Sequence, residues 1–205
     1  DEYGVNHGKG IAIGDVGWAP VNCGYKAATA DSKGFPYGKL YQWGRKYGQG
    51  YDSNDESYPS EDNLVEGPVM PSVGHSDDNK DKFYYNSEYP HDWSKVLSDD
   101  IWNSGTGRAP VKTEYDPCPE GWRVPTDSEL MQLGHNKSSS IIVGGQRGNY
   151  FSGNYTYLDR APQVFLPVAG QRSGEDGRVH SRGSGHFYYW SSLPFKGTPH
   201  EHWFS

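Results

Sequence analysis

Histidine is the residue type in this sequence that could most directly bind a metal ion, and half of the histidines lie near the end. Of the eight histidines, four fall in the last 26 residues: His180, His186, His200 and His202. If this segment is a strand, His200 and His202 project from one face and could act as a pair of ligands. Two ligands are too few, and no carboxylate or thiol at a familiar spacing completes them. We therefore expect no metal site and no cofactor, and interpret these histidines as surface residues.

The sequence also contains no complete motif for calcium binding or for catalysis. The acidic stretches 52–56 and 77–81 lack the sixth-position Gly and twelfth-position Glu of the twelve-residue calcium loop, so we interpret them as solvated loops. The Gly-x-Ser-x-Gly elbow of hydrolases fails at Ser184, because Arg182 stands in its first position. The sequence contains no phosphate-binding loop and no His-Glu-x-x-His motif. We predict that the protein is not an enzyme.

The end of the chain has instead the composition of a recognition surface. Between His186 and Ser205 the aromatic residues are Phe187, Tyr188, Tyr189, Trp190, Phe195, Trp203 and Phe204. Ser, His and Gly are interspersed among them, and Tyr and Trp give a binding surface large contact area at low entropy cost. In a strand, some of these aromatics must point into the core, and we expect Trp190 to be one of them.

The overall composition is that of a folded domain with an acidic surface. At 205 residues the chain is long enough to bury a core, and its 15% aromatic residues compensate for a mean hydropathy of -0.89. A net charge of -7 disfavours nucleic acid and anionic membranes as partners. No apolar run approaches the length of a membrane span. Cys23 and Cys118 could form a disulfide or remain two thiols, so they leave the compartment open.

Frequent Gly and Pro predict short strands joined by long loops. The expected strands lie within 10–25 and at Ser140–Val143, Tyr155–Leu158 and Val164–Val168. Polar, acidic sequence within 51–82 predicts long loops on one surface. The spacing of apolar residues predicts a short helix around Trp93–Trp102. The dipeptide Asp176-Gly177 is typical of a hairpin turn.

The stretch 118–130, CPEGWRVPTDSEL, predicts the start of a second helix. Thr126 and Glu129 have the spacing of a capping box, in which each side chain bonds to the other residue's backbone N–H. Pro125 lies just before the cap, where it costs no helical hydrogen bond. An apolar side and a stop follow at Leu130, Met131, Leu133 and Gly134. We expect Trp122–Val124 to form a short buried strand or turn that leads into this helix.

Several stretches together resemble the major paralogous (FISUMP-type) domains found in surface proteins of gut and rumen Bacteroidetes and Fibrobacteres. They are DPCPEGWRVPTDSEL at 116–130, WAPVNCGY at 18–25, LYQWGRKYG at 40–48, LPVAG at 166–170 and YYWSS at 188–192. The Trp-Arg-Val-Pro-Thr run is also similar to one in related lipoprotein domains, and this wider group is taken to adopt a C-type-lectin-like fold.

The resemblance implies an α+β fold. The expected architecture is a single C-type-lectin-like (formylglycine-generating-enzyme-like) domain over residues 1–205, with few helices, short twisted antiparallel strands and long loops. In this architecture Trp122–Val124 lies in the core sheet and leads directly into a helix packed on that sheet. We assign structural roles to Trp122, Arg123, Pro125, Thr126, Glu129 and Trp190.

The tail resembles the variable region of proteins diversified by retroelements. In those regions adenine mutagenesis turns AAC codons into codons ending in C, which gives an alphabet without Lys, Glu, Gln, Met or Trp. The resemblance implies that residues 171–205 form a variable ligand-binding segment. The residues expected to bind the ligand are Ser173, Arg178, His180, Ser181, Arg182, His186, Phe187, Tyr188, His200 and His202. Residues outside the alphabet, expected to be fixed, are Glu175, Lys196, Glu201 and Trp203.

The sequence also departs from the families that it resembles in three respects. The calcium-dependent sugar-binding motifs of true C-type lectins are absent, and Trp102-Asn103-Ser104 is only a partial echo of one. The catalytic cysteine arrangement of formylglycine-generating enzymes is missing. Family members usually continue into a strand with Val-Arg-Cys-Val, whereas the printed sequence ends at Ser205. Neither calcium-dependent sugar binding nor formylglycine chemistry is therefore expected to carry over.

The sequence as a whole predicts a non-catalytic ligand-binding domain of a bacterial surface protein or phage tail fibre. The expected partner is a protein or glycan on another cell or surface, with an oligomer as an open option, and the expected location is extracellular, at the cell surface or on a virion tail. The first alternative is a structural subunit of a fimbria or cell envelope, whose tail packs against a neighbour. A formylglycine-type or hydrolytic enzyme is the weaker alternative.

Overall fold

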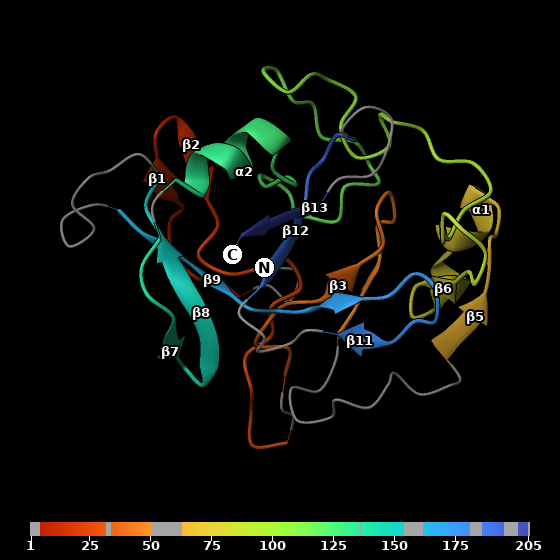
Figure 1. Cartoon of the computed structure of the whole chain (residues 1–205), viewed down its shortest axis with the longest axis horizontal. Helices are drawn as coiled ribbons and strands as arrows, with labels where there is room; N and C mark the ends of the chain where they lie inside the picture. The colour runs from red at the N-terminus through yellow and green to blue at the C-terminus, as the bar shows by residue number, and fades with distance from the viewer. Residues whose placement is uncertain are drawn as a thin grey trace.

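Short strands make up most of the regular structure, as the sequence predicts for an α+β chain with few helices. The computed structural model describes residues 5–31, 34–50, 63–135, 137–153, 162–180 and 186–194, and the backbone of 201–204. Within these ranges the two α-helices are α1 (Pro71–Gly74) and α2 (Asp127–Leu133), and a 3₁₀ turn spans Asp77–Asn79. In Figure 1 the strands β5 and β6 and helix α1 lie at one end of the long axis, and β7 and β8 lie at the other.

The largest sheet has three strands and confirms two of the expected strands. It consists of β7 (Ile141–Val143), β8 (Gln146–Phe151) and β9 (Val164–Pro167), all antiparallel. The third expected strand, Tyr155–Leu158, lies outside the described residues. In β9 the side chains of Val164, Leu166 and Pro167 are buried, so this sheet carries one wall of the core.

The other strands form pairs. Four pairs are antiparallel: β1 (Ile11–Ile13) with β2 (Val16–Trp18), β3 (Leu40–Tyr41) with β4 (Gly48–Gln49), β10 (Gln171–Arg172) with β11 (Val179–His180), and β12 (Phe187–Trp190) with β13 (Glu201–Phe204). The fifth pair, β5 (Leu64–Glu66) with β6 (Phe83–Tyr85), is parallel, which corrects the expectation of antiparallel strands only. A parallel pair needs a crossover connection, and here it contains α1.

Helix α2 begins as predicted. The Thr126 side chain accepts a hydrogen bond from the backbone N–H of Glu129, and the Glu129 carboxylate accepts one from the N–H of Thr126. Leu130 and Leu133 are buried, but Met131 is 56% exposed and does not belong to the apolar side. The helix ends at Gly134, whose N–H donates to the carbonyl of Leu130.

Trp122–Val124 is an irregular segment that follows a turn at Glu120 and Gly121 and joins no sheet, which corrects the expectation of a core strand there. The reason lies in Asp116, whose buried carboxylate accepts hydrogen bonds from the N–H groups of Cys118 and Val124. These donors are therefore satisfied by a side chain, and no ladder partner is needed. Val124 is buried, and the segment leads into α2 as predicted.

The prediction of a helix around Trp93–Trp102 is wrong, because the structure has no helix in this segment. Its apolar residues do not share one helix face: Trp93 and Trp102 are buried, whereas Val96 is 59% exposed. The Ser94 hydroxyl bonds to both the N–H and the carbonyl of Val96. Such local side-chain bonds compete with helical ones and hold the segment in an irregular path.

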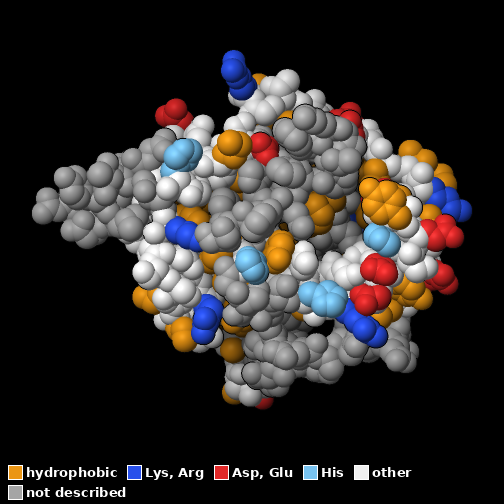
Figure 2. Space-filling model, in the orientation of Figure 1, with side chains coloured by type: hydrophobic (Ala, Val, Ile, Leu, Met, Phe, Trp, Pro, Cys, Tyr) orange, Lys and Arg blue, Asp and Glu red, His pale blue; other side chains and the backbone are white. Residues whose placement is uncertain are grey.

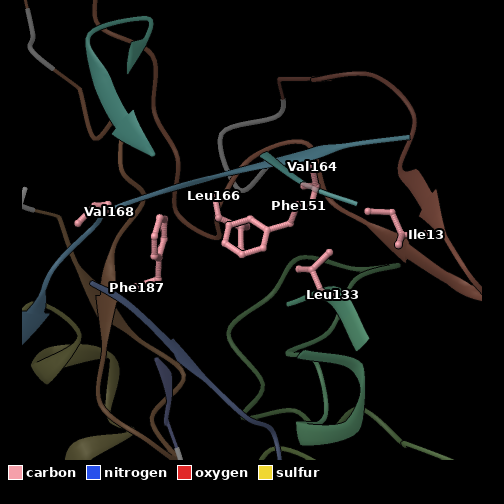
Figure 3. Close-up of a cluster of buried hydrophobic side chains, with 7 residues drawn as sticks. All are labelled: Ile13, Leu133, Phe151, Val164, Leu166, Val168 and Phe187. Carbon is pink, nitrogen blue, oxygen red and sulfur yellow. The ribbon is translucent and has the colours of Figure 1, made fainter. Parts of the chain in front are cut away.

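Two buried clusters form the core. The first contains Ile13, Leu133, Phe151, Val164, Leu166, Val168 and Phe187. Figure 3 shows these side chains converging from strands, helix α2 and the tail onto the two phenylalanine rings. The second cluster contains Trp43, Trp102 and Val124, with Trp190 and Tyr41 packed against it. Both clusters therefore join the tail to earlier parts of the chain.

A buried arginine organises the segment that follows β3. Arg45 is 0% exposed, and its guanidinium donates hydrogen bonds to the carbonyls of Gly74, Asn79 and Lys82 and to the side-chain oxygen of Gln42. It also lies over the rings of Tyr84 and Trp93. Burial lowers the pKa of Arg45 to about 10, so the group stays charged at neutral pH. Among the described residues no carboxylate pairs with it.

His75 lies beside this arginine, between two aromatic rings. Its ring centroid is 5.5 Å from that of Trp93 and 4.3 Å from that of Tyr115. In the described part of the chain neither ring nitrogen has a hydrogen-bond partner. Burial, together with the charges of Arg45 and Lys46, lowers the pKa of His75 to about 4.

This histidine should make the protein less stable in mild acid. In the unfolded chain His75 takes up a proton near pH 6.5, while in the folded chain it stays neutral down to about pH 4. The free energy of unfolding should therefore fall as the pH falls from 6.5 to 4, by roughly 2 kcal/mol after allowance for partial solvent access. Urea unfolding at pH 7 and pH 4.5 measures this loss. His75→Phe should reduce it and the exposed His135→Gln should keep it; an equal loss in both variants would contradict the assignment.

Candidate functional site

The tail begins with a hairpin that holds three of the residues expected to bind a ligand. Strands β10 and β11 pair Gln171 with His180 and Arg172 with Val179. The turn between them is closed by hydrogen bonds from the N–H of Ser173 to the carbonyl of Arg178 and from the N–H of Gly177 to the carbonyl of Ser173. The hairpin indicated by Asp176-Gly177 is thereby confirmed.

Glycine is required at two positions of this turn. Gly177 has a φ of +73°, and a Cβ there would come within 2.6 Å of the Leu64 side chain. A Cβ on Gly174 would meet the carbonyl oxygen of His91 at 2.8 Å. The carbonyl of Gly174 accepts a hydrogen bond of 2.7 Å from the N–H of Asn86. The tip of the hairpin is thus packed against the loop that contains Asn86 and His91.

Arg172 holds the base of the hairpin. Its guanidinium lies 4.3 Å from the ring centroid of Phe83 in β6, and its Nε donates a 2.8 Å hydrogen bond to the carbonyl of Gly177. Burial lowers the pKa of Arg172 to about 10. The side chain therefore ties the hairpin to the β5–β6 pair, and its role is structural.

The outer side of the hairpin carries a small charged cluster. Asp176 Oδ2 is 3.3 Å from Arg178 Nε, and Asp176 Oδ1 is 3.9 Å from His180 Nε2. Burial opposes ionisation of Asp176, but hydrogen bonds from Arg178 and Ser173 lower its pKa. Arg178 and His180 are exposed. Figure 2 shows acidic, basic and histidine side chains close together over the region where β11 lies in Figure 1.

Strand β12 divides its residues between the core and a cavity. Phe187 is 1% exposed and packs on Phe151, with ring centroids 5.5 Å apart and nearly perpendicular. This is a correction, because Phe187 was expected to bind the ligand. The alternation of side chains along a strand sends it inward, whereas the half-buried Tyr188 faces the other way and lines the cavity.

Each residue from 189 to 192, at the end of β12 and directly after it, forms a hydrogen bond with a distant part of the chain. Tyr189 Oη donates to the carbonyl of Pro167 and accepts from Asn22, and burial raises the pKa of Tyr189. The indole N–H of Trp190 donates to the carbonyl of Tyr41 at 2.9 Å. Further bonds join the Ser191 carbonyl to Trp43, the Ser192 hydroxyl to Asn103 and the Ser192 N–H to the Pro125 carbonyl. This part of the tail belongs to the framework, and Trp190 points inward as predicted.

A cavity of about 500 Å³ lies where the tail meets the N-terminal segment and the loop before α2. Aromatic side chains from all three regions line it, among them Trp18, Trp122 and Tyr188. Gln171 and Arg172 extend the lining to the base of the hairpin. The hairpin and β12 therefore meet along this cavity.

The predicted ligand-binding residues divide into five groups. Arg178 and His180 are exposed on the hairpin, and His186 and Tyr188 are half-buried on or beside β12. The Ser173 hydroxyl accepts a hydrogen bond from the N–H of Glu175, so Ser173 supports the turn. Phe187 is in the core. Ser181, Arg182 and His200 lie outside the described residues, and of His202 the structure describes only the backbone, opposite Tyr189.

The residues assigned structural roles around α2 form a connected set. Arg123 makes a two-bond ion pair with Glu129, and that hydrogen bonding raises the pKa of Arg123. A Cβ on Gly10 would come within 2.9 Å of the Trp122 ring, so this ring packs directly on the backbone beside β1. Within the described ranges no group of three His, Cys, Asp or Glu residues could hold a metal ion. In the same ranges no helix is both long and apolar enough to span a bilayer.

Sequence reasoning missed one element of the surface, the loop from Asn86 to Asp92. The buried Asn86 side chain accepts a hydrogen bond from the N–H of Glu88 and donates one to the carbonyl of Asp92. His91 has a φ of +66°, and Tyr89 is 90% exposed at the tip. No sequence pattern links this loop to the tail, because the connection is a backbone bond to Gly174.

Comparisons of the chain with protein-family models, with curated proteins and with solved structures gave no match.

Proposed function

We propose that this chain is a non-catalytic ligand-recognition module in which a fixed framework presents exchangeable side chains of the tail. The observation that carries the proposal is the division of the tail into two kinds of position. Phe187, Tyr189 and Trp190 are bound into the framework by packing and by hydrogen bonds to distant residues. Arg178 and His180 project from a hairpin whose shape depends on backbone bonds and two glycines.

This division is what an exchangeable binding surface requires. Side chains whose replacement leaves the backbone bonds intact can vary with little effect on stability, because substitutions at exposed positions usually change it by less than about 0.5 kcal/mol. The proposal includes a C-type-lectin-like fold, diversification of residues 171–205 by a retroelement, and a place on a bacterial surface or a phage tail fibre. These parts rest on the sequence resemblance. The ligand is a protein or glycan on another surface.

The proposal predicts that binding and stability separate at the hairpin. The double variant Arg178→Ala/His180→Ala should keep the thermal midpoint of the parent within about 2 °C, since both side chains are exposed. Its binding to the surfaces or glycans that the parent recognises should fall at least ~10-fold, as expected for loss of binding anchors. Labelled parent and variant are compared on glycan arrays and on intact bacteria.

The matched control is Met131→Ala, an exposed change on α2 outside the tail, which should bind like the parent. If the double variant keeps the parent's binding profile, the hairpin is not part of the recognition surface. Light scattering after size exclusion tests the structural-subunit alternative, which requires a stable oligomer that protects the hairpin from modification.

A further inference from the structure

Two cysteines from distant parts of the sequence lie together at the wall of the cavity. Cys23 Sγ donates a hydrogen bond of 3.2 Å to the carbonyl of Pro117 and is 3.1 Å from the hydroxyl of Tyr41. Cys118 directly follows Pro117, so the Cys23 thiol lies against the backbone next to Cys118. Both cysteines are half-buried thiols that line the cavity.

The backbone holds each cysteine in its place. The N–H of Cys118 donates to the Asp116 carboxylate at 2.8 Å, and its carbonyl accepts from Lys112 Nζ at 2.6 Å. The carbonyl of Cys23 accepts from the N–H of Lys39, and a Cβ on Gly38 would come within 2.7 Å of that same oxygen. These backbone contacts therefore hold the two cysteines at the same wall of the cavity.

We propose that Cys23 and Cys118 form a disulfide site, which a small disulfide such as oxidised glutathione reaches through the cavity. The Cys23 thiolate attacks one sulfur of the oxidant, forms a mixed disulfide and releases one glutathione thiolate. The Cys118 thiolate then attacks the Cys23 sulfur and releases the second glutathione. The protein dithiol is oxidised, one glutathione disulfide is reduced to two thiols, and two protons leave the cysteines.

The order of the two steps follows from the environment of Cys118. Its hydrogen bond to the Cys23 thiol and its burial raise the pKa of Cys118, so at neutral pH it remains a thiol. Cys23 is therefore assigned the first attack, and the second step should accelerate with rising pH. The product would tie the N-terminal segment to the loop before α2 across the cavity. This inference is independent of the proposed recognition function.

The test uses the full chain, which contains these two cysteines only. Reduced protein is incubated with oxidised glutathione, and the digested product is analysed by mass spectrometry without reductant. The expected product is an intramolecular Cys23–Cys118 cross-link, formed at least ~10-fold faster in the folded chain than in urea because folding raises the local thiol concentration. The cross-linked protein should melt about 10 °C higher than the reduced protein, since a long loop is closed in the unfolded state.

Single variants separate the two steps. Cys118→Ser should accumulate glutathione at Cys23, whereas Cys23→Ser should react slowly at Cys118; both keep a side chain that can hydrogen-bond. A folded parent that gives only mixed disulfides, fails to react, or cross-links no faster than the urea-unfolded chain would overturn the proposal.

Discussion

Methionine at position 45 should leave the protein largely unfolded at room temperature. Arg45→Met removes every donor from a site that is 0% exposed, and the carbonyls of Gly74, Asn79 and Lys82 then have no guanidinium to bond. Four hydrogen bonds from a charged group are lost, and each contributes about 1.5–3 kcal/mol, so the total loss should exceed ~4 kcal/mol. This is comparable with the whole stability of an ordinary domain, which is about 5–15 kcal/mol.

The companion variant Arg45→Lys tests whether shape or charge matters. A lysine keeps the charge, but its single ammonium group cannot reach carbonyls on several sides in the way the planar guanidinium does. We expect it to lose roughly half as much stability as methionine does. Urea unfolding followed by tryptophan fluorescence measures both losses, because Trp93 lies beside the guanidinium. The control Lys46→Met, at the exposed neighbouring residue, should change stability little. A similarly small effect for Arg45→Met would show that the hydrogen bonds of the Arg45 guanidinium are not needed for stability.

Local signals in the sequence predicted local structure well. The capping box of Thr126 and Glu129 needs only residues three apart, so its outcome depends little on the rest of the fold. The hairpin at Asp176-Gly177 follows for the same reason, since only glycine adopts the backbone conformation at 177 without strain. The strands at 141–143 and 164–167 follow from runs of β-branched and apolar residues.

Features that depend on distant contacts were not visible in the sequence. Apolar spacing around Trp93–Trp102 resembles a helix face, but Trp93 instead donates a hydrogen bond to the carbonyl of Trp43. The burial of Arg45 could not be predicted from the sequence either, because its main hydrogen-bond partners are backbone carbonyls, which every residue has. The parallel β5–β6 pair similarly depends on a crossover that residue types do not specify.

The candidate site could be predicted in part. The set of residue types that adenine mutagenesis can produce includes Arg178 and His180, which are exposed. It also includes Phe187, which is buried. This set depends only on how a codon can mutate, whereas the burial of a side chain depends on which face of β12 points to the core. The set therefore could not distinguish the buried Phe187 from exposed residues. The hairpin contacts the loop at Asn86 through a hydrogen bond from the backbone N–H of Asn86 to the carbonyl of Gly174. Neither segment's sequence could predict this contact, because any two residues can form a backbone bond.

Phe187 and Tyr188 are neighbours on β12, and serine at these two positions should have very different effects. Phe187 is 1% exposed among Phe151, Val168 and the rest of the first cluster, so Phe187→Ser should cost about 4 kcal/mol or more through a cavity and a buried hydroxyl. Tyr188 is half-buried at the cavity, and Tyr188→Ser should cost about 1 kcal/mol.

A library that randomises both positions extends this comparison to every residue type. Sorted for protease resistance on a display host, position 187 should return only large apolar residues, while position 188 should accept polar and small ones. This outcome follows because core side chains pack closely around Phe187, whereas the Tyr188 side chain lines the cavity. Equal tolerance at both positions would mean that β12 does not divide its residues in this way. The separation of framework from displayed side chains, on which the proposed ligand recognition by the tail rests, would then fail.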